Sequence, residues 1–163
     1  MEILRTIPMD GTFDQLSPVR RLRGKYTSYS FDLKSATDRW PLGFMFELVR
    51  CMFGRSFASS AVNSTLGVNI FQVNFVKKFR PSEISFVTGQ PLGYYASWAL
   101  FAFSHHFLVW WCAERVRPGE RFTDYAILGD DIIIADEAVA KEYELALQRL
   151  WWGSDILSKI PCL

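Results

Sequence analysis

The run Tyr125-Ala-Ile-Leu-Gly-Asp-Asp-Ile-Ile-Ile-Ala-Asp136 constrains the fold more than any other part of the sequence. Two core-like apolar segments flank a polar turn that contains Asp130 and Asp131. This pattern predicts a β-hairpin with the two acids at its tip. Taken alone, an acidic turn of this kind is usually an ordinary solvated turn, so the hairpin indicates a fold before it indicates a function.

The remaining patterns predict an α+β fold. A β-like run over residues 26–33 alternates Tyr29 and Phe31 with serines, and a second β-like region covers 68–87. Helices are expected over 41–53, 94–115 and 138–152, packed mainly on one face of an antiparallel sheet of about three or four strands. The first of these helices is expected to share one apolar face among Leu42, Met45, Phe46, Val49 and Met52.

Composition narrows the class of protein without identifying it. The chain has 163 residues, of which 50% are apolar and 16% aromatic, so it can bury a core as one domain. The formal net charge of +1 does not by itself indicate a nucleic-acid-binding protein. The cysteines are far apart and odd in number, which favours a reducing compartment over a disulfide framework: Cys51, Cys112 and Cys162. The N-terminus resembles neither a signal peptide nor a transit peptide.

Two further acids give the acidic turn a possible function. Asp32 ends the apolar 26–33 run, and Asp38 follows shortly after it. Ser35, Thr37 or Asp38 could simply cap the following helix. Together with the hairpin, however, two strands that end in acids can bring three carboxylates to one point in a sheet. Carboxylates so placed suit Mg²⁺, and a pair of such ions can clamp the attacking and leaving oxygens of a nucleotidyl transfer.

Three segments, in this order, resemble motifs A, B and C of viral RNA-dependent RNA polymerases: residues 29–39, 88–98 and 125–136. The local sequence around motif B is similar to that of mitovirus polymerases: Gly89-Gln-Pro-Leu-Gly93, followed by Ser97-Trp98 and by Phe-Ser-His-His at 103–106. The upstream Asp10-Gly-Thr-Phe-Asp-Gln15 also resembles that family, and the likeness runs from about residue 7 to 159. The resemblance implies a polymerase palm, RNA template and nucleoside triphosphates as partners, and a mitochondrial location.

The resemblance also implies a role for individual acids and for one lysine. Asp32 and Asp130 would hold two Mg²⁺ or Mn²⁺ ions, with Asp131 as an auxiliary metal ligand. Asp38 would face the incoming ribose. Lys159, where motif D would begin, could protonate the pyrophosphate leaving group, although an exposed tail lysine is an equally good interpretation.

The motif B segment would line the nucleotide pocket. Gly89 and Gln90 would lie at the mouth of the motif B helix. Ser97 falls where many RNA polymerases have an Asn that reads the ribose 2′-hydroxyl, and Gly93 falls where many have a Thr. These two departures leave the mode of ribose selection open.

Two alternatives to a working polymerase remain. Fingers and thumb are expected to be largely absent, so the chain could be a truncated palm that is non-catalytic, a mitochondrial remnant of an integrated viral gene. The apolar stretch 94–113 could instead span a membrane, but the polar run Ser104-His105-His106 at its middle argues against this. The two histidines are expected to be satisfied core or edge residues, and the basic cluster Arg20, Arg21, Arg23 and Lys25 a solvated surface.

Overall fold

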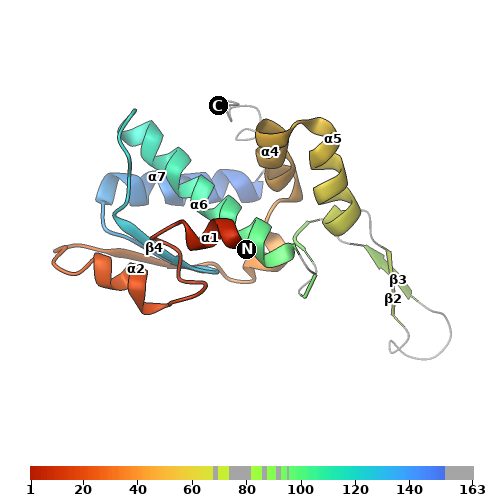
Figure 1. Ribbon diagram of the computed structural model, residues 1–163, viewed down its shortest axis with the longest axis horizontal. Coiled ribbons are helices and arrows are strands. Elements are labelled where there is room, and N and C mark those ends of the chain that lie inside the picture. The colour runs from red at the N-terminus through yellow and green to blue at the C-terminus, as the bar shows by residue number, and fades with distance from the viewer. Residues whose placement is uncertain (68–69, 74–81, 86–87, 91–92, 95, 153–163) are drawn as a thin grey trace.

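The computed structural model describes residues 1–67, 70–73, 82–85, 88–90, 93–94 and 96–152. In this part of the chain, a three-stranded antiparallel sheet carries helices α6 (Ser97–Val116) and α7 (Glu137–Trp152) on one face (Figure 1). The chain is therefore a mixed helix-and-sheet protein, as the sequence predicts.

The sheet consists of β1 (Tyr29–Asp32), β5 (Asp131–Ile134) and β4 (Tyr125–Leu128), in that spatial order. β4 and β5 form the expected hairpin, and β5 also pairs with β1. Side chains alternate across the sheet, so Ile132 and Ile134 are buried against the helices, with 1% and 0% of their surface exposed. The opposite face carries Ser30, Asp32, Asp131 and Ile133, and is called here the open face.

The outer edge of β4 is covered by the N-terminal segment. The backbone N–H of Ile127 donates to the Met9 carbonyl at 2.9 Å, and the Gly11 N–H donates to the Ile127 carbonyl at 2.7 Å. A Cβ atom at Gly11 would lie 3.1 Å from that same carbonyl oxygen, so glycine allows the close approach. This pairing satisfies backbone groups that an edge strand would otherwise leave open.

Helix α6 forms the centre of the core. It begins at Ser97, three residues later than the sequence pattern predicts, and buries ten residues that include Phe101, Leu108 and Cys112. Helix α7 lies alongside α6 and begins where the Asp136 carboxylate accepts a hydrogen bond from the Val139 N–H at 2.9 Å. No helix among the described residues is both long enough and apolar enough to cross a membrane.

Helix α4 (Leu42–Phe53) confirms the expected helix over 41–53, but its expected buried face is partly wrong. The buried residues are Phe44, Met45, Leu48 and Val49, whereas Met52 is 45% exposed. The reason is a second packing partner, α5 (Arg55–Ala58) with the π-helix η1 (Ser59–Gly67), that the sequence pattern did not reveal. Val49 packs against this partner while Phe44 and Met45 join the main core, so α4 has two buried sides.

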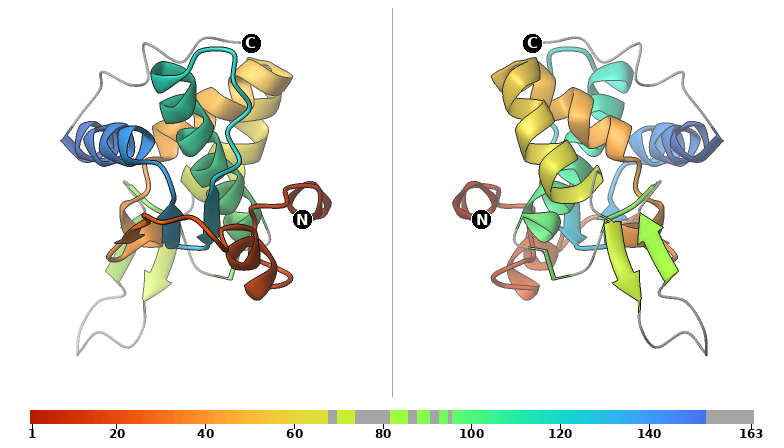
Figure 2. Two further views of the ribbon diagram at one scale, coloured as in Figure 1. Left: turned by 90° about the vertical axis from the view of Figure 1, so that its left-hand side faces the viewer. Right: turned by 90° about the vertical axis from the view of Figure 1, so that its right-hand side faces the viewer.

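The remaining elements are short. Strands β2 (Ile70–Val73) and β3 (Ser82–Ser85) form a separate antiparallel pair within the expected 68–87 region. Figure 1 shows this pair at the end of the molecule away from the main sheet, and Figure 2 shows its two strands side by side in yellow-green. Three short helices complete the description: α1 (Glu2–Arg5), α2 (Leu16–Arg21) and α3 (Ala36–Arg39). The first two precede β1, and α3 follows it directly.

Candidate active site

The predicted acids gather at one end of the sheet. Asp32 is the last residue of β1, and its cross-strand partner is Asp131, the first residue of β5. Paired residues of antiparallel strands have Cα atoms about 4.5–5.5 Å apart. Asp130 lies in the adjoining turn, where its carbonyl accepts a hydrogen bond from the Leu33 N–H at 3.2 Å. The expectation that Asp32 and Asp130 end neighbouring strands is therefore only partly correct: Asp32 ends β1, but Asp131 rather than Asp130 begins the neighbouring strand.

These three carboxylates are exposed, and no cation of the described residues pairs with them. Uncompensated carboxylate oxygens are the ligands that Mg²⁺ and Mn²⁺ prefer, so the donor chemistry fits such an ion. In the described part of the chain, however, no three His, Cys, Asp or Glu side chains converge as a ready metal-ligand set.

The start of motif B docks on α3, the short helix of motif A. The Gly89 N–H donates to the Trp40 carbonyl at 3.0 Å, and the Gln90 N–H donates to the Thr37 carbonyl at 2.7 Å. Gly89 has a φ of 72°, and a Cβ atom there would lie 2.3 Å from the Asp38 carbonyl oxygen. Only glycine tolerates both conditions. The contact brings three predicted nucleotide-pocket residues together, Asp38, Gly89 and Gln90.

Gln90 and Ser97 occupy unusual positions for polar residues. The Gln90 side chain is fully buried, and its amide nitrogen and oxygen have no hydrogen-bond partner among the described residues. Such a group costs free energy, so it marks a place where a bound polar group would be favoured. Ser97 is 3% exposed at the first turn of α6. Lys159 lies outside the described residues.

The capping interpretation of the motif A polar residues is not supported. α3 follows Ser35, which has a φ of 55° and makes no side-chain capping bond. α4 follows Pro41, again without a side-chain cap. Neither helix uses these side chains as caps, and Asp38 is exposed on α3.

His105 of α6 is hydrogen-bonded to the backbone of the acidic turn. Its Nδ1 lies 2.9 Å from the Gly129 carbonyl oxygen, which can only accept, so Nδ1 carries the proton. Its Nε2 then accepts from the Tyr143 hydroxyl of α7 at 2.6 Å. Complete burial lowers the pKa of His105 to about 3, because the charged ring would lose its hydration. The histidine is therefore a satisfied core residue, as expected, and it also fixes the backbone next to Asp130.

The two neighbours of His105 tie other segments to α6. Ser104 Oγ accepts from Trp40 Nε1 at 2.8 Å, which anchors the end of motif A. His106 Nε2 donates to the Asp10 carboxylate at 2.9 Å, and its Nδ1 lies 3.0 Å from the Tyr125 hydroxyl. Burial acts to raise the pKa of Asp10, but hydrogen bonds from His106 and Thr12 outweigh it and hold that pKa below its usual value. The only signal of this network in the sequence was the polar run at the middle of an apolar helix.

The burial of His105 predicts acid sensitivity. The unfolded state binds a proton at His105 below about pH 6.5, whereas the native state does so only near pH 3, so stability falls as the pH drops through this window. Because of His105, the free energy of unfolding at pH 5 is expected to be about 2 kcal/mol lower than at pH 7. Urea unfolding at both pH values measures it. His105→Gln should remove this part of the pH dependence, and an unchanged dependence in that variant would contradict the assignment.

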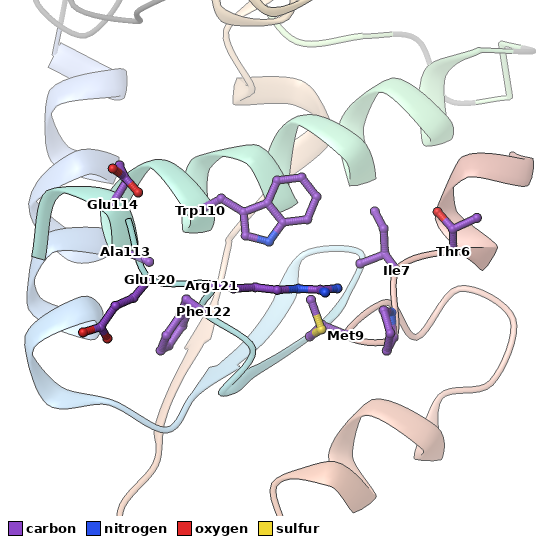
Figure 3. A pocket seen from close by; sticks show the side chains of 10 residues that line it. Thr6, Ile7, Met9, Trp110, Ala113, Glu114, Glu120, Arg121 and Phe122 are labelled. Carbon is purple, nitrogen blue, oxygen red and sulfur yellow. The ribbon is translucent and has the colours of Figure 1, made fainter. Parts of the chain in front are cut away.

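A cavity of about 360 Å³ lies at the other end of β4 from the acids. Figure 3 shows Trp110 above Arg121 and Met9, with Glu114 and Glu120 at one side. No predicted site residue lines this cavity, so it is separate from the candidate active site.

Similarity to known proteins identifies the family of the chain. The sequence profile of the mitovirus RNA-dependent RNA polymerase family matches residues 1–159, and the chain belongs to that family. The RNA-directed RNA polymerase of Cryphonectria parasitica mitovirus 1 is 35% identical over 154 residues, which cover 91% of this chain and 18% of the viral protein.

Two relatives come from Arabidopsis thaliana, and both are described as uncharacterized mitochondrial proteins. One is 64% identical over 147 residues, covering 90% of this chain and 72% of the relative. The other is 51% identical over 171 aligned positions, covering all of this chain and 68% of the relative. No solved structure matches the chain significantly.

Proposed function

We propose that this chain is a single domain of the polymerase palm type, with the catalytic acids of an RNA-directed RNA polymerase. The observation that carries the proposal is the pairing of Asp32 with Asp131, with Asp130 in the adjoining turn. Asp32 and Asp131 lie 99 positions apart in the sequence, and the sheet pairs them at one end. The family membership of residues 1–159 supports the same chemistry.

In this proposal Asp32, Asp130 and Asp131 hold two Mg²⁺ or Mn²⁺ ions. Bound there, the ions would supply the positive charge that stabilises the attacking and leaving oxygens of nucleotidyl transfer. The carboxylates carry no competing cation among the described residues, which leaves them available as ligands.

The remaining predicted residues serve substrate binding. Asp38 contacts the ribose of the incoming nucleoside triphosphate, and Gly89 and Gln90 border its pocket, where the buried Gln90 amide gains a partner. Ser97, buried at the start of α6, takes the place of the Asn that reads the ribose 2′-hydroxyl in many RNA polymerases. Lys159 donates a proton to the leaving pyrophosphate.

We also propose that the protein works in the mitochondrion. The family is that of mitoviruses, and two Arabidopsis relatives are described as mitochondrial proteins. A chain with this sequence is then either a part of an RNA-synthesising enzyme or a non-catalytic remnant of a viral gene. The aligned region covers 18% of the viral polymerase, and primer extension separates the two possibilities.

The purified 163-residue chain is expected not to extend an RNA primer, although its acids are in place. Phosphoryl transfer depends mainly on alignment and charge stabilisation, and the aligned region contains only 18% of the length of the viral polymerase. The measurement is primer extension with Mn²⁺ and a homopolymer template. Incorporation above background that disappears in Asp130→Asn would reverse this prediction and identify the chain as an active enzyme.

A further inference from the structure

Two residues on one face of α6 hold Gly129, the residue that begins the acidic turn. His105 donates a hydrogen bond to the Gly129 carbonyl. Trp98 lies seven positions earlier, which places it about two turns away on the same face of the helix. A Cβ atom at Gly129 would lie 2.6 Å from the six-membered ring of the Trp98 indole. The indole therefore lies directly against Gly129.

The backbone of Gly129 depends on such support. Its φ of 62° lies in the left-handed region, where glycine is the residue that avoids strain. Glycine is also the residue with the most conformational freedom, so the turn has little stiffness of its own. An indole ring and a hydrogen bond restrict the positions that Gly129 can take. They restrict the next residue, Asp130, as well.

Trp98 is in turn oriented by the N-terminal segment. Its Nε1–H donates to the Thr12 hydroxyl at 3.3 Å. The backbone N–H of Thr12 donates to the Asp10 carboxylate at 2.8 Å, and His106 of α6 donates to the same carboxylate. The N-terminal segment thus connects two points of α6 and fixes an indole that is 37% exposed.

The position of the turn controls how the acids can share metal ions. The Asp130 carbonyl accepts a hydrogen bond from the Leu33 N–H at 3.2 Å, so the turn is tied to the end of β1, where Asp32 lies. A pair of ions that clamps a phosphoryl transfer is about 3.5–4 Å apart, and its ligands must be held to within about 0.5 Å. Removing a residue that orients a metal ligand typically weakens metal binding by about 10–100-fold.

We propose that Trp98 is a positioning residue for the metal-ion site, and that its indole, oriented by Thr12, holds Gly129 so that Asp130 can bind the ions. Trp98 lies outside the hydrophobic core cluster, so its removal should alter the turn with little effect on folding. The inference rests on the proposed function, because it takes Asp130 as a metal ligand. It gives Trp98 no contact with the ions themselves.

The first test is a Mn²⁺ titration of the full chain, with the free ion measured by electron paramagnetic resonance. Trp98→Leu should raise the Kd for Mn²⁺ by about tenfold or more. Leucine is a good helix former, so α6 can still begin at Ser97. Trp111→Leu is the matched control, because it removes an indole near the other end of α6 and should leave the Kd unchanged.

Variants of Thr12 test whether the hydroxyl acts through the indole. Thr12→Val removes the hydroxyl and nearly keeps the shape, so it should raise the Kd by less than Trp98→Leu does. Thr12→Ser keeps the hydroxyl and should restore the affinity of the natural chain. Combining Thr12→Val with Trp98→Leu should give the same Kd as Trp98→Leu alone, because the two groups act in one chain of contacts.

Hydrogen exchange without divalent ions provides a readout that does not require the metal. The Leu33 amide, which donates to the Asp130 carbonyl, should exchange faster in Trp98→Leu than in the natural chain or in Trp111→Leu. Unchanged exchange at Leu33, equal Mn²⁺ affinity of Trp98→Leu and the natural chain, or an equal loss in Trp111→Leu would overturn the inference. Failure of the proposed function is distinguishable, because the natural chain itself would then bind no Mn²⁺, and exchange at Leu33 would still decide whether Trp98 holds the turn.

Discussion

His105→Ala is expected to lower the free energy of unfolding by about 3–4 kcal/mol. The ring is fully buried among Trp40, Phe101 and Tyr143, with centroid distances of 5.3, 5.9 and 5.9 Å. Its removal leaves a cavity, and it also leaves the Gly129 carbonyl and the Tyr143 hydroxyl without their partner. Chemical denaturation at pH 7.5 measures the change.

Tyr143→Phe is the control for this prediction. It removes only the hydroxyl bond to His105 and should cost about 1 kcal/mol. A loss below about 1 kcal/mol for His105→Ala would show that the histidine does not brace the acidic turn. If Tyr143→Phe lowered the free energy of unfolding as much as His105→Ala does, the stabilisation would come from the tyrosine hydroxyl instead.

Gly89→Ala is expected to destabilise the contact between motifs A and B by about 2–4 kcal/mol. The new Cβ atom would meet the Asp38 carbonyl oxygen at 2.3 Å and the Thr37 carbonyl oxygen at 2.5 Å, and both are backbone atoms that cannot rotate away. The backbone φ of 72° adds strain. Hydrogen exchange should then report faster exchange of the Gln90 amide, which bonds to Thr37.

Gly93→Ala provides a matched comparison. Gly93 has a similar φ of 83°, but a Cβ atom there would meet nothing within 4 Å. Its cost should be the backbone strain alone, about 1–2 kcal/mol. Equal losses for the two variants would mean that the close approach of Gly89 to Asp38 contributes nothing.

Local patterns in the sequence were sufficient for the sheet and the main helices. The hairpin around Asp130 and the strand ending at Asp32 follow from alternation and turn chemistry, and the structure confirms that they pair. The exact register was beyond these patterns, because cross-strand pairing depends on how the sheet packs on α6. As a result, Asp131 rather than Asp130 lies opposite Asp32.

The hydrogen bonds that connect α6 to the acidic turn and to the N-terminal segment could not be derived from local sequence patterns. His105 bonds to Gly129 across 24 positions of sequence and His106 bonds to Asp10 across 96, and such pairings depend on the tertiary fold. The buried sides of α4 were likewise mispredicted, since its packing partner α5 with η1 has little hydrophobic periodicity. The basic cluster of Arg20, Arg21, Arg23 and Lys25 is exposed, as the sequence predicts.

The metal-ion site is tested most directly by Mn²⁺-dependent thermal unfolding of the natural chain and Asp130→Asn, with Asp14→Asn as the control. Asp14 is an exposed acid that accepts hydrogen bonds at the start of α2, and asparagine can replace it there. An ion that binds only the folded state stabilises it by about 2.7 kcal/mol at a concentration of 100 times its dissociation constant. We expect Mn²⁺ to raise the melting temperature of the natural chain and of Asp14→Asn, and to leave that of Asp130→Asn unchanged. An equal rise in all three proteins, or none in the natural chain, would contradict a metal site at the end of this sheet.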